Sequence, residues 1–172
     1  MTVIKRITSA DGYKLLQAVN HLTNKSLKVG WINGAHYDDG AQVAGVAEQN
    51  EFGNPNKHIP ARPFMRPTVS REQNNWQKIA DDGGKKIIKG SLTVDSVLDL
   101  LGQKVTGDIK DSIKAVYYPA LAERTVLARI ERSSKLSRIK GPIKSATLGN
   151  VTKPLIDTAL MFDSITHEIT SE

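Results

Sequence analysis

The side chains best suited to catalysis or metal binding are four histidines, which stand far apart in the sequence: His21, His36, His58 and His167. No two of them have the i, i+4 spacing that places a pair of metal ligands on one helix face. His36 is close to Asp38 and Asp39, and this is the one local group that could hold a cation. The other oxygen ligands of a calcium loop are missing, so a solvated loop is the simpler interpretation. A metal-dependent hydrolase built on these three residues stays open as an alternative function.

Other signatures of catalysis are missing. Glu48 and Glu51 could form a pair of carboxylates on one helix face, although a polar helix face is the simpler explanation. Gly83-Gly84-Lys85-Lys86 lacks the glycine spacing and the Lys-Ser/Thr ending of a phosphate-binding loop, and no serine stands in a nucleophile elbow. The chain has no cysteine, which excludes disulfides, thiolate metal sites and cysteine nucleophiles. We therefore expect a protein that is not an enzyme and that has no cofactor or metal.

Periodic apolar residues predict the elements that hold these groups in place. In the first part of the chain they indicate a helix over 11–24, a half-buried strand over 27–32 and a short helix over 41–52. Asn33-Gly34 predicts a turn after the strand, because both residues tolerate a positive φ. Gly53 is the expected end of the second helix.

A proline-rich segment over 53–68, here called the strap, favours extended or irregular backbone. Two longer helices are expected next, over 69–89 with a weak point at Gly83-Gly84, and over 94–116, with Ser91 or Thr93 placed to cap its start. The remaining elements are one or two helical turns over 125–130, a basic loop or arm over about 131–151, a short helix over 154–162 and a strand over 164–169 whose His167 faces the more solvated side. Residues 1–172 then form one α+β domain with a small, mainly antiparallel sheet packed against two longer helices.

The net charge of +6 is unevenly placed. Ten basic and four acidic residues lie between Lys104 and Lys144, so this stretch alone accounts for the whole excess. Such a stretch is typical of a surface that meets an acidic partner, or of a solvated loop. A basic nucleic-acid-binding module is therefore an alternative function. Against it, the stretch contains only Tyr117 and Tyr118 as aromatic residues and no known reader motif.

The strap is the least generic part of the sequence. It carries two arginines, Arg62 and Arg66, and two apolar anchors, Phe64 and Met65. Prolines lower the entropy that a segment loses on docking, so a stiff strap suits contact with another surface. The alternative is that the apolar residues fill the core while the arginines are surface charges. We also expect Phe52, Phe64 and Trp76 to belong to the core.

Several motifs along the chain occur in the same order in a known family. They are Val29-Gly30-Trp31-Ile32, the run from Val43 to Asn50-Glu51-Phe52-Gly53, the segment Ile59-Pro60-Ala61-Arg62-Pro63-Phe64-Met65-Arg66-Pro67, Trp76, and Lys153-Pro154-Leu155-Ile156-Asp157-Thr158 followed by Ser164-Ile165. In these motifs the sequence resembles the neck or tail-completion proteins of long-tailed bacteriophages, also described as virion morphogenesis or minor tail proteins. The match covers nearly the whole chain and is poorer between Ala122 and Val151.

The resemblance implies a structural protein of the virion at the head–tail junction, needed before tails join filled heads. It implies a ring, most simply a hexamer, that contacts neck and tail proteins such as the connector or stopper and the tail terminator. It also implies assembly in the host cytoplasm, proximity to packaged DNA and no membrane. In a ring each copy presents two different surfaces to its neighbours. The strap and the arm are the candidate surfaces, and their residues are Arg62, Phe64, Met65, Arg66, Arg132, Lys135, Arg138, Lys140 and Lys144.

The arm has few large apolar residues to offset an ordering cost of about 1–2 kcal/mol per residue. We therefore expect residues 131–151 to become ordered only in the assembled particle.

Overall fold

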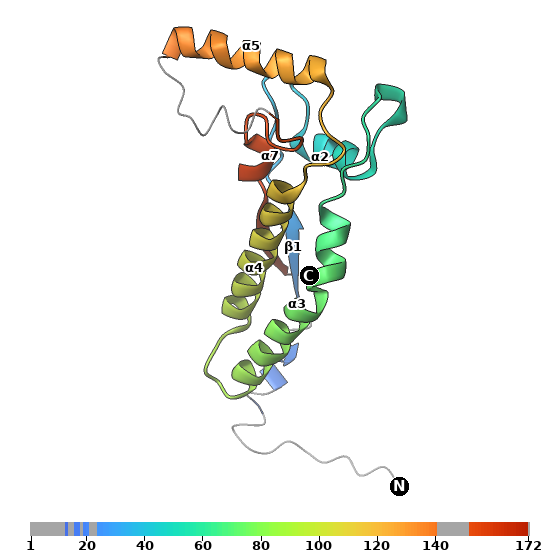
Figure 1. Cartoon of the computed structure of the whole chain (residues 1–172). Helices are drawn as coiled ribbons and strands as arrows, with labels where there is room; N and C mark the ends of the chain where they lie inside the picture. Colours follow the sequence, from blue (N-terminus) through green and yellow to red (C-terminus); the bar gives the residue numbers. More distant parts are fainter. Residues whose placement is uncertain (1–12, 14–15, 18, 21–23, 141–151, 172) are drawn as a thin grey trace.

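A computed structural model of the chain describes residues 13, 16–17, 19–20, 24–140 and 152–171. The molecule is elongated (Figure 1): two long helices, α3 (Met65–Ile88) and α4 (Val94–Ala115), lie side by side along its length, and α5 (Glu123–Lys140) lies across one end. At about 1.5 Å per residue, the 24 residues of α3 extend roughly 36 Å. The end of the molecule that carries α5 is called the head end below.

The sheet joins two distant parts of the chain. Strand β1 (Lys25–Gly30) pairs antiparallel with β2 (Thr166–Ser171), so that Lys25 faces Ser171 and Gly30 faces Thr166. Both strands pack against α4. The α+β fold class is therefore confirmed, with a two-stranded antiparallel sheet packed on helices. The strand expected over 27–32 begins two residues earlier, and the strand expected over 164–169 is shifted two residues towards the C-terminus.

The short helix α2 (Val43–Phe52) ends at Gly53, as expected from the sequence. Gly53 has φ 78°, and a Cβ at this position would lie 2.8 Å from the backbone nitrogen of Ala61. Only glycine fits such a close backbone approach. The chain then forms a 3₁₀ turn, η1 (Pro55–Lys57), and an isolated bridge between Asn54 and Ile59 returns it towards α3.

The helix α3 begins four residues earlier than the expected 69–89. Pro67 lies in its first turn, where the missing N–H would have no helical partner, so the proline does not interrupt the helix. Gly83 and Gly84 do not break the helix either. A Cβ on Gly83 would lie 2.3 Å from a methyl carbon of Val97, which shows that α3 and α4 approach closely at this glycine. Thr93 caps α4 as expected, accepting a hydrogen bond from the amide of Ser96.

The loop expected from Glu131 is wrong for residues 131–140, which continue α5. The apolar pattern of α5 is weak because one of its body-facing residues is Arg129, whose side chain is buried through polar contacts. The helix expected over 154–162 is also wrong over most of its length. Residues 154–159 form turns and bends, and only α7 (Leu160–Asp163) is helical. The carbonyl groups of this turn accept hydrogen bonds from the Arg129 side chain, so they have a donor without forming a helix.

Of the helix expected over 11–24, the described residues Tyr13, Leu16, Gln17, Val19 and Asn20 are helical, whereas Asn24 lies in a turn. Tyr13, Leu16 and Val19 are exposed there. Leu15 and Leu22, which complete the expected apolar stripe, lie outside the described residues.

The main core surrounds the start of α3. It consists of Val43, Ala47, Phe64, Ile109, Ile113, Leu155, Ile156, Met161 and Ile165. A smaller cluster of Ile87, Val94 and Val97 closes the opposite end of the α3–α4 pair. In the described part of the chain, no helix is long and apolar enough to span a membrane.

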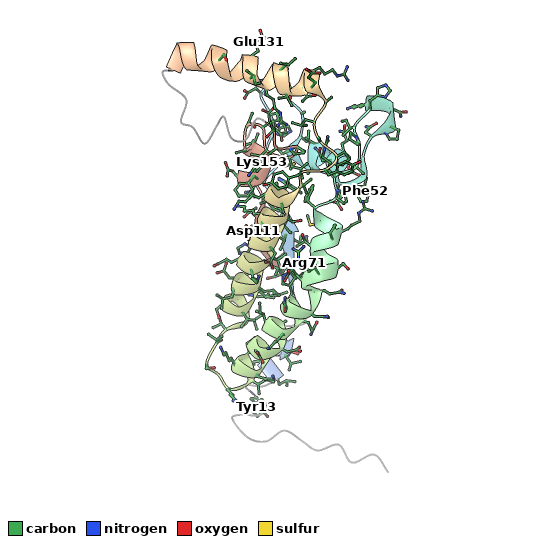
Figure 2. The ribbon with its side chains drawn as sticks, viewed as in Figure 1. Tyr13, Phe52, Arg71, Asp111, Glu131 and Lys153 are labelled. Carbon is green, nitrogen blue, oxygen red and sulfur yellow. The ribbon has the colours of Figure 1, made fainter. Side chains whose placement is uncertain are left out.

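The expected core residues have three different outcomes. Phe64 is 1% exposed, which confirms the prediction for this residue, and its ring meets Trp31 edge to face. Trp76 is half-buried and donates to Asp108 Oδ2 at 2.8 Å. The prediction is wrong for Phe52, which is 61% exposed and lies near the start of α3 in Figure 2. Phe52 comes one residue after Glu51, the last buried residue of α2, and its side chain therefore points away from the buried face of the helix.

Candidate functional site

Glu51, the buried carboxylate at the end of α2, organises the strap. It accepts hydrogen bonds from the amides of the next helix: one oxygen from Phe64 at 2.7 Å and Met65 at 2.9 Å, the other from Arg66 at 3.1 Å. These amides belong to the first turn of α3, which has no side-chain cap of its own. A carboxylate at a helix N-terminus satisfies free donors and interacts favourably with the helix dipole. Glu51 therefore caps α3 from a different helix.

The Glu51 carboxylate is held in its charged form. Burial raises its pKa, but hydrogen bonds from Met65, Phe64 and Arg66 outweigh burial, and the pKa is lowered below its ordinary value. Arg66 Nε donates to Glu51 Oε1 at 2.9 Å, and its guanidinium lies 4.6 Å from the centre of the exposed Phe52 ring. Arg66 and Phe52 are thus linked on the surface, beside the buried carboxylate.

Arg62 differs from the surface charge expected by one of the two interpretations of the strap. It is 5% exposed, and it donates from Nε to the carbonyl of Pro119 at 2.7 Å and from Nη2 to that of Ala120 at 3.0 Å. Its backbone amide donates to the carbonyl of Asn50 at 2.7 Å. Burial lowers the pKa of Arg62, and the positive charge of Arg129 lowers it further. Arg62 thus fastens the strap to the segment between α4 and α5.

The other strap residues are also used within the chain. Phe64 is buried and its carbonyl accepts from Thr68 Oγ1 at 2.7 Å and Ser112 Oγ at 2.9 Å, while Met65 is half-buried against the core. Of the four strap residues proposed as contact residues, Arg66 alone is exposed.

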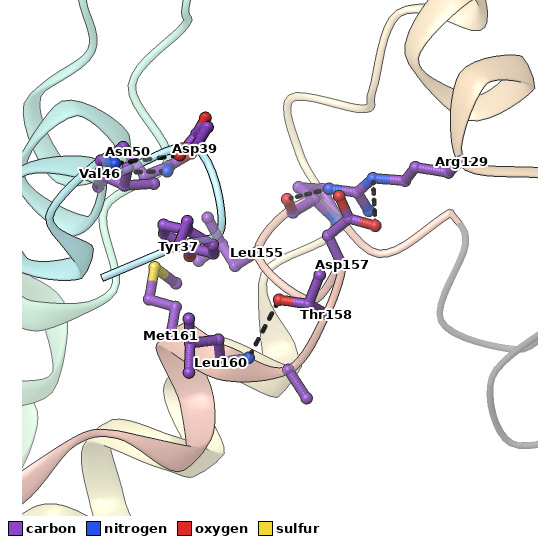
Figure 3. Close-up of a pocket in the computed structure, with 13 residues that line it drawn as sticks. Tyr37, Asp39, Val46, Asn50, Arg129, Leu155, Asp157, Thr158, Leu160 and Met161 are labelled. Carbon is purple, nitrogen blue, oxygen red and sulfur yellow. Dashed lines mark hydrogen bonds and ion pairs between the residues drawn. The ribbon is translucent and has the colours of Figure 1, made fainter. Parts of the chain in front are cut away.

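A second group of contacts attaches α5 to the turn that precedes α7. The guanidinium of Arg129 donates to the carbonyls of Lys153 at 2.7 Å, Ile156 at 3.2 Å and Pro154 at 3.3 Å. Its Nε lies 3.5 Å from Asp157 Oδ1 (Figure 3). Burial lowers the pKa of Arg129, although the Asp157 carboxylate opposes this shift. The motif Lys153 to Thr158 is therefore a turn whose carbonyls bind one arginine.

A cavity of about 260 Å³ lies between this turn, α2 and the loop before α2. Figure 3 shows Tyr37, Leu155 and Met161 grouped on one side of it and Arg129 with Asp157 on the other. Burial raises the pKa of Tyr37, and the nearby Asp157 and Asp39 raise it further. The tyrosine hydroxyl therefore stays protonated, and the cavity offers no activated nucleophile from this residue.

The expected arm residues fall on α5 and beyond it. Arg132 is exposed and pairs with Asp157 at 2.8 Å. Lys135, Arg138 and Lys140 lie on the last part of α5, for which the backbone alone is described, and Lys144 lies outside the described residues.

Much of the basic excess on α4 is compensated locally. Lys104 pairs with Asp108 at 2.5 Å, and Lys114 pairs with Asp111 at 3.3 Å. Lys110 and Lys114 also lie over the ring of Phe162. The positive charge is therefore concentrated towards α5.

The loop with His36, Asp38 and Asp39 forms a tight turn. Asp39 accepts a hydrogen bond from the amide of Ala41 at 3.0 Å, and His36 bridges to Gln42. Among the described residues, no three His, Asp or Glu side chains come together as a metal site would require.

His167 lies against α4, not on the more solvated side of its strand. Its Nε2 lies 2.9 Å from Asp99 Oδ1, and its ring packs over Gly102, where a Cβ would lie 2.4 Å from the imidazole. The hydrogen bond with His167 lowers the pKa of Asp99. The alternation of apolar and polar residues in the sequence does not show which face of the two-stranded sheet is covered by α4.

Comparison with known proteins gives little guidance. No protein-family model matches the chain, and no solved structure matches it. A protein of Methanocaldococcus jannaschii, described as uncharacterized, is 38% identical over 68 residues. The match covers 40% of this chain and 41% of that protein, so the chain spans about two fifths of the relative's length.

Proposed function

We propose that the chain is a structural protein of a bacteriophage virion that acts at the head–tail junction as a ring, completing the tail or connector so that heads and tails join. The resemblance of its motifs to neck and tail-completion proteins suggests this role. The structural observation that supports it is a set of large apolar side chains exposed at the head end. They are Phe52, Tyr117, Tyr118, Leu127 and Ile130.

The helix α5 is the main candidate for the contact with a neighbour. Its buried side is fixed to the body through Arg129, whereas Leu127 and Ile130 are 58% and 42% exposed. Exposed apolar side chains that gather in one region often indicate a protein–protein contact. In a ring such a contact is heterologous, so that α5 of one copy meets a different surface of the next. The neighbouring neck and tail proteins are the other partners that we propose.

The experiment separates folding from assembly. Leu127→Gln with Ile130→Gln should leave the melting temperature within a few degrees, since both side chains are exposed. In a phage that depends on this chain, joined particles counted by electron microscopy should become rare. A matched control replaces Ile88 and Leu100, which are 63% and 53% exposed, with glutamine. Normal joining by the α5 variant, or equal loss in the control, would contradict the proposal.

Nucleic-acid binding is the second candidate, and the exposed cations on α5 favour it. Arg124 and Arg132 are exposed, and Arg132 pairs with the carboxylate of Asp157. A gel shift with duplex DNA should then weaken steeply with salt. Replacing Arg124 and Arg132 with glutamine should reduce the salt slope by about two. Affinity that is unchanged in this variant would contradict binding through α5.

A further inference from the structure

A second cavity at the head end carries concentrated positive charge. It has a volume of about 530 Å³ and lies between η1 with the residues that follow it, the segment leading into α5, and the first turns of α5. Its lining includes five basic side chains and no aspartate or glutamate. The basic residues are Lys57, His58, Arg62, Arg124 and Arg129.

This charge is only partly offset by the chain itself. In the described part of the molecule, Arg62 forms no ion pair: its guanidinium meets the carbonyls of Pro119 and Ala120. Arg129 pairs with Asp157, which also pairs with Arg132 and belongs to the lining of the other cavity. Two largely buried guanidinium groups, those of Arg62 and Arg129, therefore line a cavity whose lining contains no carboxylate. Buried charge of one sign favours a ligand of the opposite sign.

The shape and chemistry of the cavity favour an acidic polypeptide segment. A guanidinium presents planar donors that match a carboxylate, which makes arginine well suited to bind one. Apolar surface from Ile59, Pro60 and Leu121 lies beside the basic groups and suits the remainder of a peptide. A volume of about 530 Å³ is in the range of ligand sites of roughly 300–1,000 Å³ and exceeds what one small anion fills.

Nucleic acid fits less well. No Phe, Tyr or Trp is among the lining residues, so bases find no stacking partner there. We propose that this cavity binds an aspartate or glutamate side chain presented by an acidic segment of a partner protein. The proposal goes beyond the virion role and does not depend on it.

The test uses the full chain and a short capped peptide with two glutamates separated by alanine. Titration followed by calorimetry should show binding, and amide signals of residues 120–125 should shift in NMR spectra. Lys57 and Arg124 are exposed, so replacing both with glutamine should preserve the fold. The loss of two charged contacts should weaken binding at least tenfold. The control replaces Lys78 and Lys86, exposed lysines of α3, and removes the same charge.

Six outcomes decide the proposal. Binding that is lost in the Lys57/Arg124 variant and retained in the control supports it, as does failure of the same peptide with glutamine in place of glutamate. No binding, or shifts that avoid residues 120–125, overturns it. Equal weakening in both variants also overturns it, because the effect is then one of net charge. If inorganic phosphate or a single-stranded oligonucleotide displaces the peptide at lower concentration, the natural ligand is a phosphate and the assignment to an acidic polypeptide is wrong.

Discussion

Two charged residues, Glu51 at the end of α2 and Arg62 in the strap, hold the strap in place within the fold. Glu51 caps a helix that has no cap of its own, and Arg62 reaches the carbonyls that follow α4. A polar group buried with several good hydrogen bonds stabilises one arrangement of the chain and disfavours others. The motifs around these residues can therefore be explained by the fold alone, and a role in assembly falls to their exposed neighbours.

The first prediction concerns the Glu51 cap. Replacing Glu51 with glutamine removes the negative charge that faces three amides and Arg66, and should lower the free energy of unfolding by about 1–3 kcal/mol. The native pKa lies below the ordinary 4.5, so the stabilisation is present above that pH and is lost as pH falls through the native pKa. Urea unfolding at a series of pH values from about 6 to 3 measures this, since that range spans the ordinary pKa of 4.5.

Glu48 provides the control, because it is exposed on the same helix. Glu48→Gln should unfold like the parent at every pH. The cap assignment fails if the parent and Glu51→Gln lose stability in parallel between pH 5 and pH 3.

A second prediction distinguishes the two strap arginines. Arg62→Ala leaves two carbonyl groups without their donor and a void beside the strap, so it should cost about 2–3 kcal/mol. Arg66→Ala removes an exposed guanidinium and leaves the buried Glu51 carboxylate its three amide donors, so it should cost less, about 1 kcal/mol. Chemical denaturation of each single variant provides the measurement. Similar small costs for both variants would mean that Arg62 is a surface charge after all.

At the scale of elements, the glycines in helices show where two elements meet. Gly83 and Gly84 are neighbours in α3, yet an added Cβ would meet Val97 at 2.3 Å in one case and open space in the other. The close contact with Val97 explains why glycine, which has a poor helix propensity, occupies position 83. The second glycine has no packing neighbour within 4 Å of its added Cβ.

A third prediction follows from this pair. Gly84→Ala should raise the free energy of unfolding by up to about 1 kcal/mol, because alanine has the higher helix propensity. Gly83→Ala should instead lower it by about 1–3 kcal/mol through overpacking against α4. Thermal unfolding of the two variants, followed by circular dichroism, compares them directly. Stabilisation by both alanines would show that α3 and α4 do not approach closely at Gly83.

The elements that the sequence predicts well are those whose own residues carry the signal. The period of apolar residues and the Thr93 cap place α4 within a residue, and Gly53 places the end of α2. The misplaced boundaries depend on distant partners. The early start of α3 requires Glu51, and the turn before α7 requires Arg129 from α5. The order of residues along the chain carries no information about such partners. From the sequence alone, Glu51 is therefore expected on a polar helix face and Arg129 in a solvated stretch.

At the scale of the whole molecule, two arginines attach α5 to the turn before α7. Arg129 is its buried anchor, and Arg132 adds an exposed ion pair with Asp157. Replacing Arg129 with glutamine should therefore increase hydrogen exchange of residues 124–132 at least tenfold, which corresponds to about 1.4 kcal/mol. Arg132→Gln is the control and should change exchange little, since exposed pairs contribute about 0–1 kcal/mol. A larger effect of Arg132→Gln than of Arg129→Gln would show that Arg132 is the main contact that holds α5.

The pairing of β1 with β2 also has a consequence for synthesis of the chain. Ser26 and Thr170 bond across the sheet although they are 144 positions apart, and the core around Phe64 includes Leu155, Met161 and Ile165. At about 5–20 residues per second, the first strand waits on the order of ten seconds for its partner. The α3–α4 pair uses local contacts and can form in that interval. A nascent chain stalled on the ribosome before Ile165 should therefore protect α3 and α4 at Gly83 from proteolysis, while β1 and the start of α3 stay sensitive until β2 emerges.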